Sequence, residues 1–459
     1  MSPPIASHRV LPTLNQDGTR RWIRPRLYPG KTWRARRIVA WVLMVAFVAL
    51  PWLEVGGKPV ILLDVVRREF TLFGSTFLAT DGVLLMLLLL AIFVGVVLVT
   101  ALVGRAWCGW ACPQTVYLEF LYRPIERLFE GKREQQMELD KQGPNLRRYL
   151  KNGVFLLISV VLGNAFLAYF VGSKSLVHWV TSSPSEHPQA FLVMAAVSAL
   201  TFFDFAYFRE QMCTVACPYA RLQSVLLDPR SLIVGYDARR GEPRAKGKPR
   251  PGAGDCIDCN ACVAACPTGI DIRHGLQLEC VACAQCADAC DSIMEKIKKP
   301  PGLIRYDAQQ SLETGLKVRV LRPRVLIYTG ILVVLLIALV LVASARGSAE
   351  LTVLRGIGAP FELRDGLAQN QIRIKVQNRS GETQRYQIEL LDAADARLVA
   401  PENPLEVTAG AQRSTSVFVM VPTNRLSHGQ RPVRFRITDQ SGAQVEAPYR
   451  LLGPEGGQP

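Results

Sequence analysis

The residues with the clearest chemistry are eight cysteines between positions 256 and 290, arranged as two runs of C-x2-C-x2-C-x3-C. This is the spacing of bacterial ferredoxins that hold two 4Fe–4S clusters, in which the fourth cysteine of each run ligates the other cluster. Zinc modules instead use separated C-x2-C pairs. The sequence therefore predicts two cubane clusters, one on Cys256, Cys259, Cys262 and Cys290, the other on Cys280, Cys283, Cys286 and Cys266.

The other four cysteines form two copies of C-x2-A-C-P, with Cys108 and Cys112 in the first and Cys213 and Cys217 in the second. Each copy follows an apolar hairpin, which predicts an internal repeat. On a regular helix, residues i and i+4 share a face about 5–6 Å apart, too far for an easy disulfide. Two thiolates at that spacing can hold one soft metal ion such as Cu(I). The alternative is that these thiols only pack the hairpin turns.

Three further positions are weaker candidates. His178 and His187 lie in a short loop and could bind a metal, a haem or a quinone, although solvated histidines are the simpler interpretation. Asp204 lies near one end of an apolar run, where it is either functional or faces lipid headgroups. Met212, beside Cys213, is either a soft ligand or a packing residue.

The composition indicates a membrane protein. The chain has 459 residues, 49% of them hydrophobic, and a formal net charge of +16. The positive charge flanks apolar segments, which favours membrane topology over nucleic-acid binding. No cysteine precedes Cys108 or follows Cys290, so we do not expect a disulfide framework. We expect the cysteines to lie in a reducing compartment. We expect no cleavable signal peptide.

Five apolar runs, at 38–53, 83–103, 154–171, 190–208 and 325–343, are each close to the length that spans a bilayer. Lys and Arg are frequent in the N-terminal segment and in loop 104–151, and rare in loops 54–82 and 172–189. By the positive-inside rule, the N-terminus, loop 104–151 and the cysteine-bearing loop 209–324 are cytoplasmic, and the tail beyond residue 345 is outside.

These patterns predict a multi-domain fold. A basic N-terminus (1–37) precedes a four-span membrane domain (38–236), a basic linker (237–254) and a two-cluster ferredoxin domain (255–300). A connector (301–324) then leads to a fifth transmembrane helix (325–345). Residues 346–459 alternate apolar and polar side chains between turns, which is typical of an antiparallel sandwich of about seven strands. The tail shows no catalytic group, so we expect a docking or folding module.

With its ferredoxin loop between spans, its two C-x3-C-P motifs and its outer β tail, the chain resembles the cytochrome c oxidase accessory protein family, of the CcoG or FixG type. The resemblance implies an immunoglobulin-like tail and a place in the bacterial inner membrane, with the tail in the periplasm. It implies cluster ligation by the eight cysteines of the ferredoxin runs. It assigns copper or redox roles to the two motif pairs, Cys108 with Cys112 and Cys213 with Cys217.

The function that this resemblance implies is reduction of Cu(II) to Cu(I) for assembly of a cbb-type haem–copper oxidase. The implied partners are a cytoplasmic electron donor, a copper exporter or chaperone and the oxidase assembly machinery, with a second copy of the chain as a further candidate. Two alternatives stay open. One is an electron conduit from quinol to an outer reductase, and the other is a purely structural assembly factor.

Overall fold

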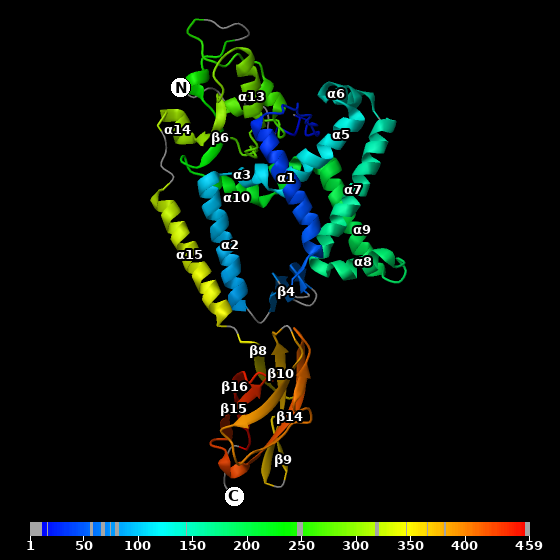
Figure 1. The fold of residues 1–459 in the computed structure, drawn as a ribbon, viewed down its shortest axis with the longest axis vertical. Helices are drawn as coiled ribbons and strands as arrows, with labels where there is room; N and C mark the ends of the chain where they lie inside the picture. Colours follow the sequence, from blue (N-terminus) through cyan, green and yellow to red (C-terminus); the bar gives the residue numbers. More distant parts are fainter. Residues whose placement is uncertain are drawn as a thin grey trace. The chain divides into compact units, whose positions relative to one another are not determined.

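The computed structural model describes residues 12–454, apart from 16, 56–57, 66–68, 74, 79–81, 144, 246–250, 317–320, 346, 365 and 381. The chain divides into two compact units, residues 1–339 and 340–459, and each is described by itself. Figure 1 shows the helical first unit and the β-rich second unit.

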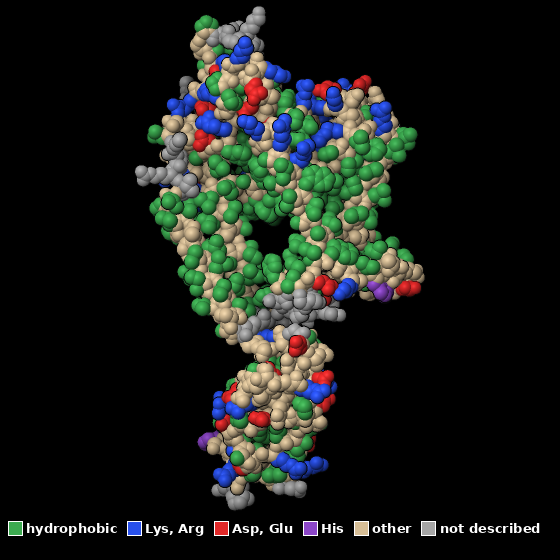
Figure 2. All heavy atoms as spheres, viewed as in Figure 1, with side chains coloured by type: hydrophobic (Ala, Val, Ile, Leu, Met, Phe, Trp, Pro, Cys, Tyr) green, Lys and Arg blue, Asp and Glu red, His purple; other side chains and the backbone are tan. Residues whose placement is uncertain are grey.

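Five helices are long and apolar enough to cross a membrane: Lys31–Trp52, Gly82–Val103, Leu146–Val171, Pro188–Phe208 and Pro323–Ser344. The first joins α1 (Lys31–Ala49) to a short 3₁₀ turn, η1 (Leu50–Trp52), and the fourth joins α9 (Pro188–Phe203) to a π-helical turn, η3 (Asp204–Phe208). The others are α2 (Gly82–Val103), α7 (Leu146–Val171) and α15 (Pro323–Ser344). Figure 2 shows apolar side chains covering these helices as a belt, with Lys and Arg gathered along one border. The protein is therefore a multi-pass membrane protein.

The first helix begins earlier than the sequence predicts. It starts at Lys31 within the predicted N-terminal segment 1–37, because the carboxylate of Asp288 accepts hydrogen bonds from the backbone N–H groups of Thr32 and Trp33. This carboxylate, from a distant part of the chain, pairs with first-turn N–H groups that have no partner within the helix. Residues 1–11 of the predicted segment lie outside the described residues.

The loops predicted to face outward carry structure that the sequence did not indicate. Loop 54–82 forms a short hairpin and a three-stranded antiparallel sheet. Its strands are β1 (Glu54–Val55), β2 (Lys58–Pro59), β3 (Ile61–Asp64), β4 (Glu69–Leu72) and β5 (Ser75–Leu78). Helix α8 (Ser173–Thr181) occupies half of the predicted loop 172–189.

Short helices follow the second and fourth spans, where the two C-x3-C-P motifs lie. After α2 the chain forms α3 (Ala106–Trp110), α4 (Pro113–Tyr117), a π turn η2 (Leu118–Tyr122), α5 (Arg123–Glu130) and α6 (Arg133–Gln142). After η3 it forms a second π turn, η4 (Met212–Ala216), and α10 (Pro218–Leu226).

The ferredoxin region is larger than predicted. It contains α12 (Ala261–Ala265), the 3₁₀ turn η5 (Ile272–His274) and α13 (Gln285–Lys296). Two strands bracket it, β6 (Leu232–Tyr236) and β7 (Ile304–Ala308), and they pair antiparallel from Leu232 opposite Ala308 to Tyr236 opposite Ile304. β6 lies in the predicted membrane domain and β7 in the predicted connector, so both strands lie outside the predicted ferredoxin domain (255–300).

The predicted linker and connector are also partly folded. Helix α11 (Ala238–Gly241) begins the linker, and the Arg240 guanidinium donates 2.9 Å to the carbonyl oxygen of Pro301. Helix α14 (Gln309–Thr314) follows β7 in the connector. Residues 246–250 of the linker and 317–320 of the connector lie outside the described residues.

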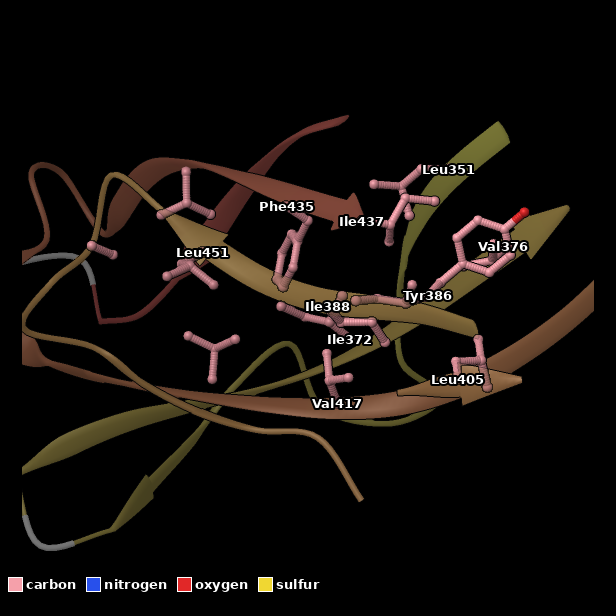
Figure 3. Close-up of a cluster of buried hydrophobic side chains, with 14 of the residues drawn as sticks. Leu351, Ile372, Val376, Tyr386, Ile388, Leu405, Val417, Phe435, Ile437 and Leu451 are labelled. Carbon is pink, nitrogen blue, oxygen red and sulfur yellow. The ribbon is translucent and has the colours of Figure 1, made fainter. Parts of the chain in front are cut away.

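The tail is an immunoglobulin-like sandwich of two antiparallel sheets, ordered β12-β14-β10-β8, with β9 on β10, and β13-β11-β15-β16. The described part has nine strands where the sequence predicts about seven, and three of the nine, β9, β12 and β13, are only three residues long. Figure 3 shows its core, where Ile372, Val417 and Phe435 from both sheets are fully buried. The strands are β8 (Ala349–Arg355), β9 (Glu362–Arg364), β10 (Leu367–Asn378), β11 (Gln384–Leu391), β12 (Arg397–Val399), β13 (Leu405–Val407), β14 (Gln412–Pro422), β15 (Gln430–Thr438) and β16 (Gln444–Leu452), with a 3₁₀ turn η6 (Thr423–Arg425).

Candidate iron–sulfur and thiol site

The two cysteine runs share one backbone conformation. In the first run Asp258 and Asn260 have positive φ angles of 54° and 55°, and in the second run Ala282 and Ala284 have 52° and 54°. These four residues occupy equivalent places around the second cysteine of each run, and side chains other than glycine rarely adopt this conformation. The repeated strain turns the chain back on itself, so that three successive cysteines face one point.

Each run lines its own cavity, and each cavity has about 340 Å³ of empty space. The first is lined by Cys256, Cys259, Cys262 and Cys290, the second by Cys266, Cys280, Cys283 and Cys286, with Cys262 also on its wall. The fourth cysteine of each run thus crosses to the cavity of the other. This is the grouping that the sequence predicts.

The donor chemistry fits a cluster of several metal ions. The four cysteines grouped around each cavity are the ligand set of one 4Fe–4S cluster. Burial raises the pKa of Cys280 to about 12. The thiolate there therefore needs a strong neighbouring positive charge, which bound iron supplies.

A buried arginine supplies further positive charge at the second cavity. Arg36, on α1, is fully buried, and its Nε donates 2.8 Å to the carbonyl oxygen of Gly109. Its Nη1 and Nη2 have no hydrogen-bond partner in the described structure, and its charge acts on Cys283. A desolvated guanidinium with two spare donors beside a cysteine suits an anionic cluster, because such donors are costly to leave unpaired.

The first C-x3-C-P motif packs directly on the second cysteine run. A Cβ atom at Gly109 would lie 2.7 Å from the carbonyl oxygens of both Val281 and Ala282, so only glycine fits between the two cysteines of the motif. Trp110 Nε1 donates 2.9 Å to the hydroxyl of Tyr306, which donates 2.6 Å to the carbonyl oxygen of Ala282. The motif is therefore held against the second cavity on both sides of Gly109.

Arg105 reinforces this contact from the end of α2. It is buried, and its guanidinium donates to the carbonyl oxygens of Leu278 and Cys280 and, at 2.7 Å, to that of Ala220. One side chain thus ties together the first motif, the second cysteine run and the helix that follows the second motif.

The two motifs exchange contacts with each other. Cys108 Sγ donates 3.1 Å to Oε1 of Gln223, which follows the second motif, and Gln114, which follows the first, donates 3.1 Å to Oδ1 of Asp204. All four motif thiols are half-buried. Burial raises the pKa of Cys108 and of Cys213, and the neighbouring thiols of the two motifs raise both further. The structure therefore brings both pairs into one site.

The expectation that each pair lies on a regular helix is wrong. Cys108 lies in α3, but Cys112 has extended backbone angles, φ −62° and ψ 126°, and precedes α4. In the second motif Cys213 lies in the π turn η4 and Cys217 is extended before α10. Pro113 and Pro218 therefore begin the next helix, where their missing N–H costs nothing, instead of ending the preceding one.

The weaker candidates have different outcomes. Asp204 does not simply face headgroups, because it accepts a hydrogen bond from Gln114 beside the thiols. Met212 is 37% exposed, at the start of η4. The rings of His178 and His187 lie 5.3 Å apart, His178 exposed and His187 partly buried, at the end of the spans remote from the cysteines. The sequence did not predict this pairing.

A buried ionic cluster fixes the segments around the site. Glu126, on α5, accepts 2.9 and 2.8 Å hydrogen bonds from Arg209 and a further one from Arg24. Lys151, on α7, donates 2.8 Å to Glu130. The cluster joins the N-terminal segment, the first motif's helices and the end of the fourth span. Sequence reasoning missed it, because its members are far apart in the chain.

Comparison with known proteins identifies the family. A 4Fe-4S dicluster domain model matches residues 208–309, a 4Fe-4S binding domain model matches 85–133, and a model of the IG-like fold at the C-terminus of FixG matches 339–454. The chain is 33% identical to the nitrogen fixation protein FixG of Rhizobium meliloti, over 95% of this chain and 94% of that protein. It is 34% identical to protein RdxA and 36% identical to protein RdxB of Cereibacter sphaeroides, over 91% and 83% of this chain and 92% and 84% of theirs. The chain therefore belongs to the FixG family, as a membrane-associated iron–sulfur electron-transfer protein.

Proposed function

We propose that this protein reduces Cu(II) to Cu(I) at the four motif thiols, for insertion into a cbb-type haem–copper oxidase. The supporting observation is the contact of Gly109 with Val281 and Ala282, which places the thiol site against the second cysteine run. When bound, the 4Fe–4S clusters supply one-electron carriers, and Cu(II) needs one electron. In this proposal the ferredoxin region is cytoplasmic, the tail is periplasmic and an exporter or chaperone accepts the cuprous ion.

The thiol site would bind copper through its sulfur atoms. Soft thiolate ligands favour Cu(I) over Cu(II), which makes reduction more favourable and release a separate step. No three motif thiols lie within reach of a single ion in the described structure, so we expect the thiols to act in pairs. Gln223, which accepts from Cys108, would orient that thiol.

The test is anaerobic reduction of Cu(II) by the purified protein after chemical reduction, with Cu(I) detected by a colorimetric chelator. Double replacement of Cys108 and Cys112, or of Cys213 and Cys217, by serine keeps the side-chain volume and should abolish reduction. Ala111→Ser, which adds a hydroxyl within the first motif and removes no thiol, is the matched control. Normal reduction by the serine variants would place the copper site elsewhere.

A second candidate is that the four thiols ligate a third iron–sulfur cluster. The 4Fe-4S binding domain model over residues 85–133 favours it, because Cys108 and Cys112 are the cysteines of that range. Iron content separates the two candidates. Copper reduction predicts about eight iron ions per chain, from two cubanes, in the wild type and in the serine variants alike. A third cubane predicts about twelve, with a loss of about four in the variants.

A further inference from the structure

A large basic pocket lies beside the first cysteine run. Its volume is about 540 Å³, which is within the range of small-molecule sites. Its wall includes Cys259, Asn260 and Ala261, which also line the first cavity, so the two spaces share this stretch of chain. Cys259 is exposed, unlike the other seven cysteines of the runs.

The pocket carries positive charge that the fold does not neutralise. Arg21, Arg24, Arg26 and Arg133 line it, and no Asp or Glu does so in the described structure. Arg24 is buried and paired with Glu126 and Asp140. Arg21 and Arg26 are exposed and form no ion pair among the described residues, and Arg133 uses only its Nε, which donates 2.7 Å to the carbonyl oxygen of Arg24.

The remaining wall suits a flat ring. Tyr28 lines the pocket beside the 44% exposed Met137, whereas one face of the Trp22 ring is covered by the Arg20 guanidinium, 3.9 Å from the ring centre. The backbone N–H of Arg26 donates 2.7 Å to the carbonyl oxygen of Ala264, which fixes this segment to the ferredoxin region. Figure 2 shows Lys and Arg side chains gathered on this border of the apolar belt.

From this combination we propose that the pocket binds a phosphate-bearing flavin, of the flavin mononucleotide class, as the entry point for electrons. Planar guanidinium groups match a phosphate monoester, and the Tyr28 ring matches the flat face of an isoalloxazine. A flavin can release electrons singly, as one-electron carriers require, whereas a nicotinamide gives a hydride. One fully reduced flavin releases two electrons and two protons, so it would convert two Cu(II) into two Cu(I) and return to its oxidised form. This inference rests on the proposed reductase function.

The first test is binding of flavin mononucleotide to the full-length protein in detergent, followed by flavin fluorescence. Riboflavin, which lacks the phosphate, should bind at least about tenfold more weakly. Arg21→Ala with Arg26→Ala should reduce flavin mononucleotide affinity by about tenfold or more, and added salt should weaken binding. The matched control is Arg147→Ala, an exposed arginine on α7 away from the pocket wall.

The outcomes separate this proposal from the reductase proposal. Equal affinity for the two flavins, or for wild type and the arginine double variant, overturns the pocket assignment. If free flavin does not bind but an acidic flavoprotein reduces the wild type faster than the double variant, the surface docks a protein instead. The double variant, reduced chemically and so without use of the pocket, should still reduce Cu(II) at the wild-type rate. If wild type and variant both fail at that step, the reductase proposal falls, whatever the flavin result.

Discussion

Removing the Asp288 carboxylate should detach the ferredoxin region from the first membrane helix. Asp288 lies on α13 between Cys286 and Cys290, is 7% exposed, and accepts from Thr32 N–H at 3.1 Å and Trp33 N–H at 2.7 Å. The N-cap residue of α1, Gly30, has no side chain to do this. A Cβ there would lie 2.3 Å from the Asp288 side chain. The helix thus takes its capping group from a residue more than 250 positions away.

The magnitude follows from two partly buried N–H donors. Because they are only partly buried, each donor left unpaired costs about 1–1.5 kcal/mol, at the low end of the usual range, and the loss of negative charge at a helix N-terminus costs about 0.3–1 kcal/mol more. Asp288→Ala should therefore lower the free energy of local opening by about 2–4 kcal/mol. Because 1.4 kcal/mol is a factor of ten, amide exchange in the first turn of α1 should accelerate by about 30- to 700-fold. Asp288→Asn keeps one acceptor, so it should show a smaller effect.

Hydrogen exchange of a peptide covering residues 31–36, followed by mass spectrometry, measures this directly. The matched control is Asp291→Ala on the same helix, because that carboxylate accepts 2.7 Å from Gly302 N–H within the ferredoxin region. Unchanged exchange at Thr32 and Trp33 in Asp288→Ala would show that the cap does not hold the helix. Equal acceleration in both variants would indicate general loosening of α13 instead.

Three more predictions concern the site and its surroundings. Cys290→Ser should lose the cluster associated with the first run and keep the other. Iron and sulfide analysis, together with paramagnetic resonance, would detect this loss. Loss of the second-run cluster alone would refute the crossing of the fourth ligand. Arg36→Met should make the second-run cluster harder to reduce in a potentiometric titration, because a buried positive charge beside Cys283 favours the added electron. Arg34 is exposed on the same helix, so the control Arg34→Met should leave the reduction potential unchanged. Glu126→Gln should cost about 3–5 kcal/mol of stability, because it strands buried arginines. Arg209 and the other cations around Glu126 hold the pKa of this carboxyl below its usual value, so the wild type's advantage should be full above about pH 5 and shrink as pH falls below about 4.3. A constant gap between the unfolding curves of wild type and variant across that range would contradict the ionic interpretation.

Membrane orientation gives the fifth prediction in the same way. A reporter fused after residue 345 should be active only outside the cytoplasm, and one inserted near residue 245 only inside. The reverse pattern would contradict the charge argument.

Local patterns were sufficient for much of this fold. The spacing of the eight cysteines predicted their grouping around two cavities, because that spacing is itself a local geometric constraint. Alternating residues such as 371–378 predicted strand β10 within a few positions, because the strand buries one face. Hydropathy found all five candidate spans.

Contacts between distant segments could not be read from the sequence. The start of α1 at Lys31 depends on Asp288, and the pairing of β6 with β7 joins segments that flank the whole ferredoxin region. Gly109 looked like an ordinary small residue, although its close approach to Val281 and Ala282 excludes any side chain. The regular-helix expectation for the motifs failed because Pro113 and Pro218 each start a new helix, which leaves the preceding cysteine extended.

The positions of the cavities support one direction of electron flow through the protein. The first cavity borders the basic pocket through Cys259, and the two cavities share Cys262 on their walls. Cys266, of the second cavity, also lines the pocket, and Gly109 of the thiol site lies against the carbonyl oxygens of Val281 and Ala282 in the second run. Electrons entering at the pocket would therefore reach either of the two clusters first. They would leave through the second-run cluster, which lies against the thiol site. For this reason, changes at Arg21 and Arg26 should affect only reduction by an external donor, whereas changes at the motif thiols should affect every donor, chemical ones included.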